Sequence, residues 1–223
     1  MSLALLVLGF IALGWYIPEK LRGYTVNALL KKSLVSLLFI CVAAAAASSA
    51  PLAPFVILGL VFGLCGDIWV DLKYVFPSHD KPFTYAGFTV FGIGHILYVT
   101  GLLIQFGTGR FLFVSLILAA VAAGLISATE KPMKLVYGPM KPVVLLYGFL
   151  LFSTVFVSGG LLLTQGGRTL LLFSVGSVLF AVSDLILSGT YFGVGKERPA
   201  DIISNYLFYY CGQFLIAYSL VFI

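Results

Sequence analysis

The sequence predicts an all-α integral membrane protein that forms a single bundle of about eight transmembrane helices. Of its 223 residues, 61% are hydrophobic and only 9% are charged, and the mean hydropathy is +1.12. A soluble domain usually carries about a quarter charged residues, so the expected solvent is the bilayer. The sequence shows no long linker and no charge block, which predicts one transmembrane domain over residues 1–223.

The number of helices follows from the apolar runs, since a helix needs roughly 17–25 residues to cross a bilayer. The second and third runs are separated only by Ser-Ser-Ala-Pro, which predicts a tight hairpin. The eight expected spans are about 1–17, 33–50, 52–72, 84–106, 111–128, 142–164, 169–190 and 202–223.

Orientation follows from the basic residues, which fall in alternate loops. The first run has no basic segment before it and no small-residue cleavage site, so we expect a retained helix rather than a cleaved signal peptide. One set of alternate loops carries eleven basic residues, whereas the other set carries only Arg110 and Arg168. The positive-inside rule therefore places the basic loops in the cytoplasm and both termini outside. The residues of these loops are Lys20, Arg22, Lys31, Lys32, Lys73, Lys81, Lys131, Lys134, Lys141, Lys196 and Arg198.

Two aspartates lie inside apolar runs, Asp67 in FVILGLVFGLCGDIWV and Asp184 in LLFSVGSVLFAVSDLIL. A carboxylate at membrane depth costs several kcal/mol, about 3 by insertion scales, unless a neighbour satisfies it or a function uses it. Both fall near the cytoplasmic ends of their spans, which predicts a functional acid pair. Asp71 follows Asp67 by one helical turn and is expected to lie in the headgroup region already.

Further polar side chains are expected at a similar depth. His95 and Tyr98 share a face of one span, and Asn205, Tyr209 and Gln213 follow each other at intervals of four residues on another. Each of them alone is more simply a packing or helix-pairing residue. Together with the acids they predict a small polar chamber that opens toward the cytoplasmic leaflet.

Lys31 and Lys32 are expected at the cytoplasmic mouth of this chamber. Taken alone, each is most simply a topology anchor.

Several classes of protein and site are not supported. No GxSxG elbow, HExxH motif, Walker A sequence or metal-ligand spacing is present, so we expect no metal and no organic cofactor. The net charge of +5 resides in short loops beside apolar runs, where it encodes topology rather than nucleic-acid binding. Cys41, Cys65 and Cys211 all fall in apolar runs and are expected to be core residues. The sequence carries no feature that specifies an oligomeric state.

Four short motifs follow each other along the chain: Gly63-Leu-Cys-Gly-Asp67, Gly94-His95-Ile-Leu-Tyr98, Phe180-Ala-Val-Ser-Asp184-Leu-Ile-Leu and Tyr209-Tyr-Cys-Gly-Gln213-Phe-Leu-Ile-Ala. In this order they resemble the YhhN family of lysoplasmalogenases, and the resemblance runs from about Lys32 to the C-terminus. The family's second span often begins Lys-Pro-Leu where this chain has Lys-Ser-Leu, so the adjacent Lys31 stays a candidate beside Lys32.

The resemblance implies hydrolysis of the vinyl ether bond of lysoplasmalogens to a fatty aldehyde and glycerophosphoethanolamine or glycerophosphocholine. It implies that Asp67 and Asp184 are the catalytic pair and that Lys32 meets the phosphate of a lysophospholipid in the membrane. The residues expected to position water or the glycerol hydroxyl are His95, Tyr98, Asn205, Tyr209 and Gln213.

The chemistry fits two aspartates. A vinyl ether is stable to base but is cleaved after an acid protonates its alkene carbon, which leaves an oxocarbenium ion that water attacks. Two carboxyl groups in an apolar site resist double ionisation, so one can hold the proton while the other carries the charge. Glycoside hydrolysis uses the same division of roles. The sequence leaves open which aspartate is the acid.

Two other readings stay open. An intramembrane aspartyl protease also uses two aspartates on two spans, but Gly63-Leu-Cys-Gly-Asp67 only approaches its Gly-x-Gly-Asp pattern, and neither Tyr-Asp nor Pro-Ala-Leu follows. A small proton-coupled transporter would use the aspartates as relay groups, although no paired half-repeat is visible.

The small size of the chain favours a bacterial inner membrane over the endoplasmic reticulum as its location.

Overall fold

The computed structural model describes residues 1–23, 25–108, 110–193 and 198–223. Within these ranges the chain is almost entirely helical, as expected. Short 3-10 turns cover Pro77–His79, Gly138–Met140 and Leu220–Phe222. The helices are α1 (Ser2–Arg22), α2 (Val26–Ala46), α3 (Leu52–Val75), α4 (Asp80–Phe106), α5 (Leu112–Ala128), α6 (Lys141–Gln165), α7 (Arg168–Phe192) and α8 (Pro199–Ser219).

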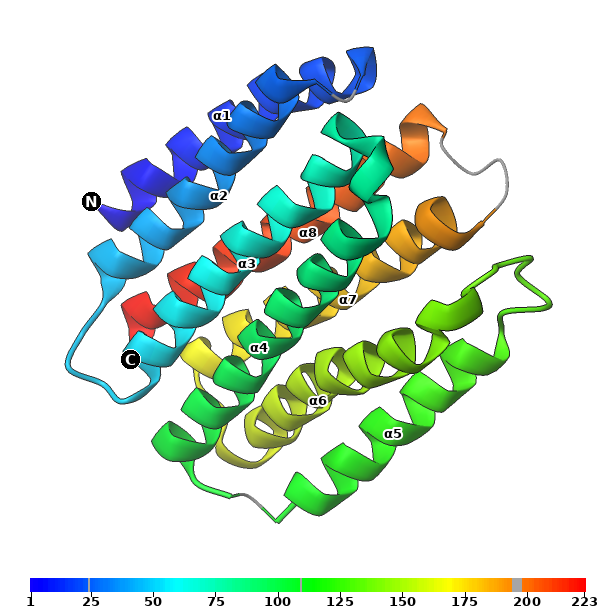
Figure 1. The fold of residues 1–223 in the computed structure, drawn as a ribbon. Helices are drawn as coiled ribbons and strands as arrows, with labels where there is room; N and C mark the ends of the chain where they lie inside the picture. Colours follow the sequence, from blue (N-terminus) through cyan, green and yellow to red (C-terminus); the bar gives the residue numbers. More distant parts are fainter. Residues whose placement is uncertain (24, 109, 194–197) are drawn as a thin grey trace.

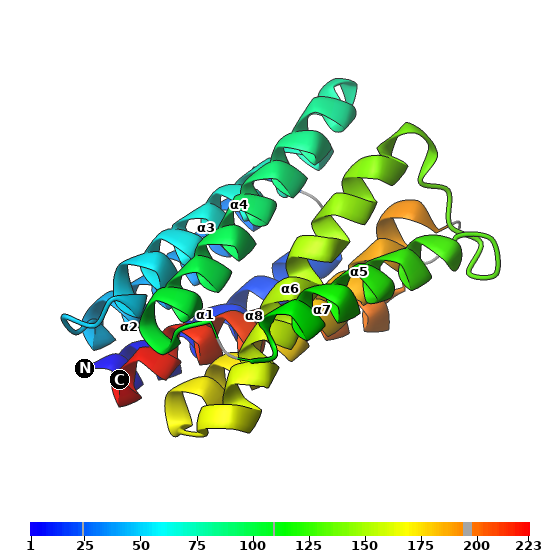
Figure 2. The ribbon, with the colours of Figure 1, turned by 90° about the horizontal axis from the view of Figure 1, so that it is seen from below.

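The helices pack as sequential antiparallel pairs, α1 with α2, α3 with α4, α5 with α6 and α7 with α8 (Figure 1). Both termini lie at one end of the bundle, and the C-terminal ends of α1, α3, α5 and α7 lie at the other end (Figures 1 and 2). Helix α8 contacts α1, α2, α3 and α7, whereas α5 packs chiefly against α6. The interior therefore centres on α8, and α5 forms an edge.

The lengths and compositions of the helices agree with a multi-pass membrane protein. Among the described residues, six helices are long and apolar enough to cross a bilayer, namely α1, α2, α3, α4, α6 and α7, where α4 and α6 are counted with the 3-10 turns that precede them. Helix α5 is strongly apolar but has only 17 residues. Helix α8, which is not among these six, is less apolar because several of its polar side chains face the interior of the bundle, including buried Asn205 and Gln213.

Local signals explain the helix ends, most of which lie within three residues of the expected positions. Thr25 caps α2, with its Oγ1 accepting a hydrogen bond from the backbone N–H of Ala28 at 3.1 Å. Gly107 and Gly166 end α4 and α6 at φ of 79° and 68°, a region that favours glycine. The expected tight hairpin joins Ala46 of α2 to Leu52 of α3.

The expected end of the first helix, at about residue 17, is wrong. Helix α1 continues through Pro18 to Arg22, although proline lacks the N–H that would bond one turn back. The extra turn makes Lys20 a buried residue of the bundle instead of a loop residue. The contacts of Lys20 in the interior, given below, explain why the helix does not stop at the proline.

The described basic residues of the expected cytoplasmic side lie toward the end of the bundle opposite the termini, most of them near the ends of helices (Figure 1). Arg110 precedes α5 and Arg168 is the first residue of α7, and both are at the end that holds the termini. Lys196, which the sequence also assigned to the basic end, lies outside the described residues. The alternation of loops on which the expected orientation depends is thus present in the fold.

Helices α7 and α8 approach each other closely because glycines face each other across the contact. A Cβ atom on Gly176 would lie 2.7 Å from the carbonyl oxygen of Gly212 and 3.1 Å from the backbone nitrogen of Ile216. A Cβ atom on Gly212 would lie 2.7 Å from the carbonyl oxygen of Gly176. Small residues permit such close helix packing in a membrane.

We expect Gly176→Ala to destabilise the protein by about 1–3 kcal/mol, because the added methyl group meets backbone atoms that cannot rotate away. Thermal unfolding in detergent, followed by fluorescence-detected size exclusion, measures the effect. Gly159→Ala is the matched control, since a Cβ atom at Gly159 of α6 meets nothing within 4 Å. Equal melting temperatures for the two variants would contradict the close contact.

Candidate active site

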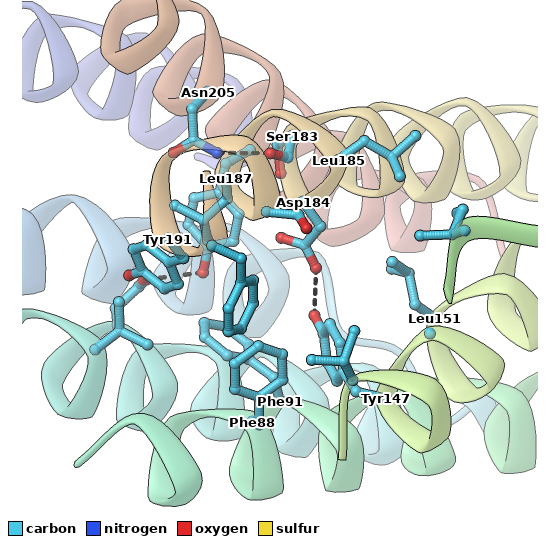
Figure 3. Close-up of a pocket in the computed structure, with 18 of the residues that line it drawn as sticks. Phe88, Phe91, Tyr147, Leu151, Ser183, Asp184, Leu185, Leu187, Tyr191 and Asn205 are labelled. Atoms are coloured by element: carbon cyan, nitrogen blue, oxygen red, sulfur yellow. Dashed lines mark hydrogen bonds between the residues drawn. The ribbon is translucent and has the colours of Figure 1, made fainter. Parts of the chain in front are cut away.

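A cavity of about 90 Å³ lies between α3, α4, α6, α7 and α8, toward the basic end of the bundle. A water molecule needs roughly 10–15 Å³ by this measure, so the cavity admits several. Aromatic rings dominate its apolar wall, notably Phe88, Phe91, Tyr191 and Phe192 (Figure 3). Its polar lining comes from Lys32, Asp67, Tyr147, Ser183, Asp184, Ser188, Asn205 and Tyr209. The two acids of the expected pair, Asp67 and Asp184, therefore line the same cavity.

Asp67 of α3 is buried, and both of its carboxylate oxygens have polar partners. Its Oδ1 lies 3.2 Å from the Nζ of Lys32, and its Oδ2 accepts hydrogen bonds from Ser36 Oγ at 2.6 Å and Tyr209 OH at 2.8 Å. Tyr210 OH lies 3.1 Å from the Ser36 Oγ. One cation and two hydroxyl donors from α2 and α8 thus surround the carboxylate, an arrangement that stabilises its charged form.

Asp184 of α7 has very different surroundings. It is half-buried at the cavity wall, and its Oδ2 accepts a hydrogen bond from Tyr147 OH of α6 (Figure 3). Among the described residues, no cation pairs with it. The rings of Phe88 and Phe91 lie beside the two polar groups, and Phe88 packs edge-on against Tyr147 with centroids 5.0 Å apart. Asp184 thus faces the cavity as a carboxyl group in apolar surroundings.

Lys32 does not lie at an open mouth, as the sequence suggested, but is 3% exposed between two carboxylates. Its Nζ lies 3.2 Å from an oxygen of Asp67 and 3.2 Å from an oxygen of Asp71. Lys31 instead pairs with Glu19 at 2.7 Å and lies over the ring of Trp15. Between the two candidate lysines, Lys32 belongs to the site.

Asp71 is buried inside the bundle and belongs to the same charge cluster. It is 4% exposed and accepts hydrogen bonds from Lys20 Nζ at 3.1 and 3.2 Å and from Lys32 Nζ at 3.2 Å. Because it follows Asp67 by four residues, it lies on the same helix face and reaches the same lysine. That spacing is the signal in the sequence that would have assigned Asp71 to the site.

Sequence reasoning also missed Ser36 and Tyr147. Ser36 follows Lys32 by one turn of α2, so the position of Lys32 could have identified it. Tyr147 lies in α6, a helix in which no polar residue stood out. Nothing local in the sequence pairs it with Asp184, 37 residues away, and only the packing of α6 on α7 does so.

A line of hydrogen bonds leads from α4 to Asp67 but does not border the cavity until it reaches Tyr209. Tyr98 OH donates to Gln213 Oε1 at 3.1 Å, and Gln213 Nε2 donates to Tyr209 OH at 3.3 Å. Tyr209 then donates to Asp67 at 2.8 Å. Tyr98 and Gln213 are therefore placed behind Tyr209, where they hold its hydroxyl, and are absent from the cavity lining among the described residues.

His95 and Asn205 take separate positions. The Nδ1 of His95 lies 3.1 Å from Thr154 Oγ1, and its ring packs against Phe180 with centroids 5.0 Å apart, behind the described cavity lining. Asn205 lines the cavity, and its Nδ2 donates to the backbone oxygen of Ser183 at 2.7 Å (Figure 3). It ties α8 to the turn of α7 that carries Asp184.

The connection between α5 and α6 packs against the wall of the cavity at the basic end. Val136 N–H donates to the Phe192 oxygen at 2.8 Å, and the Tyr137 ring packs against Phe192 with centroids 4.9 Å apart. Glu130 holds the connection together by accepting from Tyr137 N–H at 3.0 Å and Lys141 Nζ at 2.7 Å. The Lys141 ammonium, helped by that backbone N–H, holds the pKa of Glu130 below its ordinary value.

Comparison with known proteins identifies the family. Residues 26–220 match the model of the YhhN family, and the chain belongs to this family. Neither the curated proteins nor the solved structures contain a significant match. The matched segment begins at α2, so it includes the cavity but not α1.

We expect Lys32→Met to destabilise the protein by about 3–5 kcal/mol, because it leaves buried carboxylates without their shared cation. The neighbouring Lys31→Met should cost about 0–1 kcal/mol, since Lys31 pairs with Glu19 where both side chains are partly exposed. Thermal unfolding of both variants in the same detergent gives the comparison. A melting temperature for Lys32→Met equal to that of Lys31→Met would show that the buried charge cluster is wrongly described.

Proposed function

We propose that this member of the YhhN family hydrolyses the vinyl ether bond of lysoplasmalogens, such as lysoplasmenyl-ethanolamine or -choline. The products would be a fatty aldehyde and glycerophosphoethanolamine or glycerophosphocholine. The family membership and the two carboxyl groups in one membrane-embedded cavity support this activity. No metal ion or organic cofactor takes part in the proposed reaction.

The observation that carries the proposal is the unequal environment of the two acids. Asp67 accepts from a lysine and two hydroxyls, so it is suited to remain a carboxylate. Asp184 has one hydroxyl partner and no described cation partner, so it is suited to hold a proton in its apolar surroundings. We therefore assign the general acid to Asp184 and the carboxylate that orients water to Asp67.

The proposed reaction proceeds in three steps. Asp184 transfers its proton to the alkene carbon farther from the ether oxygen, and the carbon bonded to that oxygen becomes an oxocarbenium centre. A cavity water attacks this centre and loses a proton to Asp67, which gives a hemiacetal. In the collapse of the hemiacetal, Asp184 takes the proton of its hydroxyl group and Asp67 returns its proton to the departing glycerol oxygen, so that the aldehyde and the free glycerol hydroxyl form and both acids regain their starting states. General acid catalysis of this kind is typically worth about 10²–10⁴-fold.

The aromatic wall of the cavity suits the cation formed in the first step. Phe88, Phe91 and Tyr147 lie around Asp184, and aromatic faces attract a cation by roughly 0.5–2 kcal/mol, most strongly where water is excluded. Once Asp184 has given up its proton, its own carboxylate adds an opposite charge beside the oxocarbenium centre. Ring faces and carboxylate together would therefore stabilise the transition state.

The position of the cavity suits an amphiphilic substrate. The cavity lies toward the basic end of the bundle, so the phosphate would meet cationic side chains while the alkenyl chain stays in apolar surroundings. Lys73 is one such side chain, with its Nζ 3.5 Å from the ring centroid of the cavity-lining Tyr191. We propose that this end faces the cytoplasm of a bacterial inner membrane and that both termini face the other side.

The same asymmetry argues against an intramembrane aspartyl protease. Such an enzyme uses two similar carboxyl groups that share one proton across a bound water. Here Lys32 forms an ion pair with Asp67 and not with Asp184, so the two carboxyl groups would not share a proton evenly.

Both Asp67→Asn and Asp184→Asn should reduce aldehyde release from lysoplasmenyl-ethanolamine by at least about 100-fold, because each removes one of the two proposed roles. The measurement is aldehyde formation by the protein in detergent, with folding checked by size exclusion. Asp80→Asn is the matched control, since Asp80 is the first residue of α4 and its side chain is 60% exposed. No aldehyde from folded wild-type protein with either headgroup would refute the activity.

The topology gives a separate prediction. Alkaline phosphatase, which is active only outside the cytoplasm, should be active at the C-terminus and inactive after Lys134, because the basic connections stay in the cytoplasm. A fluorescent protein, which is active only inside, should give the opposite pattern. Paired alkaline phosphatase and fluorescent protein fusions provide the readout. The same location for both reporters would contradict the three crossings, by α6, α7 and α8, that we propose between those points.

A further inference from the structure

We propose that Lys20 of α1 is a positioning residue for the reaction: it holds Asp71 so that the ammonium group of Lys32 stays on Asp67. This inference rests on the proposed function, since it assigns a task within the same site. Lys20 precedes the segment that matches the YhhN family. The family comparison therefore assigns no role to it.

The contacts form a chain of alternating charges across three helices. Lys20 Nζ lies 3.1 and 3.2 Å from the two carboxylate oxygens of Asp71. Lys32 Nζ lies 3.2 Å from Asp71 Oδ1 and 3.2 Å from Asp67 Oδ1. The four side chains are each only 2–5% exposed, so solvent does little to weaken these interactions. The order is cation, anion, cation, anion, and the last member borders the cavity.

Aromatic rings hold the two lysines in place. The ring centroid of Tyr206 in α8 lies 5.7 Å from Lys20 Nζ and 5.6 Å from Lys32 Nζ. Tyr74 of α3 lies 5.2 Å from Lys20 on another side. All three distances are within the range of cation–π attraction. The turn of α1 after Pro18 brings Lys20 into this setting.

The balance of charge explains why Lys20 matters to Asp67. Two ammonium groups face two carboxylates in the intact cluster, so each carboxylate has a full opposite charge. Without Lys20, one ammonium group would serve two buried carboxylates, and an unpaired charge in a low-dielectric interior is costly. The cluster would then take up a proton. Proton uptake by the Asp67 and Asp71 pair weakens the carboxylate that orients the attacking water.

The experiment compares three variants of the full-length protein in detergent. In Lys20→Met, kcat for lysoplasmenyl-ethanolamine should fall at least about tenfold with KM changed less than about twofold, because the carboxylate is misplaced and the substrate site is not. Lys20→Arg should restore kcat, because arginine keeps the charge. Lys20→Met combined with Asp71→Asn should also restore most of it, because one ammonium group then faces one carboxylate.

Two further readouts separate this inference from the proposed activity and from simple structural damage. Infrared difference spectra should show one more protonated carboxyl in Lys20→Met than in wild type, and adding Asp71→Asn should remove that band. Lys31→Met is the matched control, since it removes a neighbouring lysine from a pair with Glu19, and both its spectrum and its kcat should match wild type.

The outcomes are distinct. Absence of aldehyde release from the folded wild type would refute the proposed activity, while the infrared comparison would still test the charge coupling. An unchanged infrared spectrum in folded Lys20→Met would overturn the inference. If Lys20→Met does not fold, the charge-balanced double variant decides: wild-type kcat supports the positioning role, and loss of kcat in the folded double variant overturns it.

Discussion

The structure depends on one constraint, that charge buried in a membrane bundle must be compensated within the bundle. Two aspartates on one face of α3 require two lysines, and these come from α1 and α2. The need is strong enough for α1 to continue past a proline. The same ion pairs that fix α1 and α2 against α3 also present one carboxylate to the cavity. Stability and the candidate chemistry therefore depend on the same contacts.

Helix α8 explains how an apolar bundle can contain a polar site without opening to water. It runs through the interior, contacts α1, α2, α3 and α7, and supplies hydroxyl and amide groups to both sides of the cavity. The close backbone contact at Gly176 and Gly212 brings α7 against it. In consequence, the two acids can share one cavity while each keeps its own hydrogen-bond partners.

The sequence revealed features that are periodic or costly, and it missed those that depend on packing between distant helices. Asp67 and Asp184 were found because acids in apolar runs need a reason, and Tyr209 and Gln213 because they recur on one helix face. Lys20 was taken for a loop residue because it follows the end of the first apolar run. The pairing of Tyr147 with Asp184 leaves no trace in composition or spacing, since it arises where α6 meets α7. The depth of Lys32 was likewise hidden, because a lysine near a helix end usually reaches for the interface.

The line of hydrogen bonds from Tyr98 to Asp67 has a direction. The amide of Gln213 accepts from Tyr98 and donates to Tyr209, so Tyr209 must donate its own hydrogen to Asp67. Every donor points toward the carboxylate, and reversing the line would require turning the amide over inside a packed core. The amide of Gln213 therefore interrupts proton transfer along this line, because an amide nitrogen does not readily pass a proton to its own oxygen. The line fixes the Tyr209 hydroxyl on Asp67 without connecting that carboxylate to Tyr98 by a path for protons.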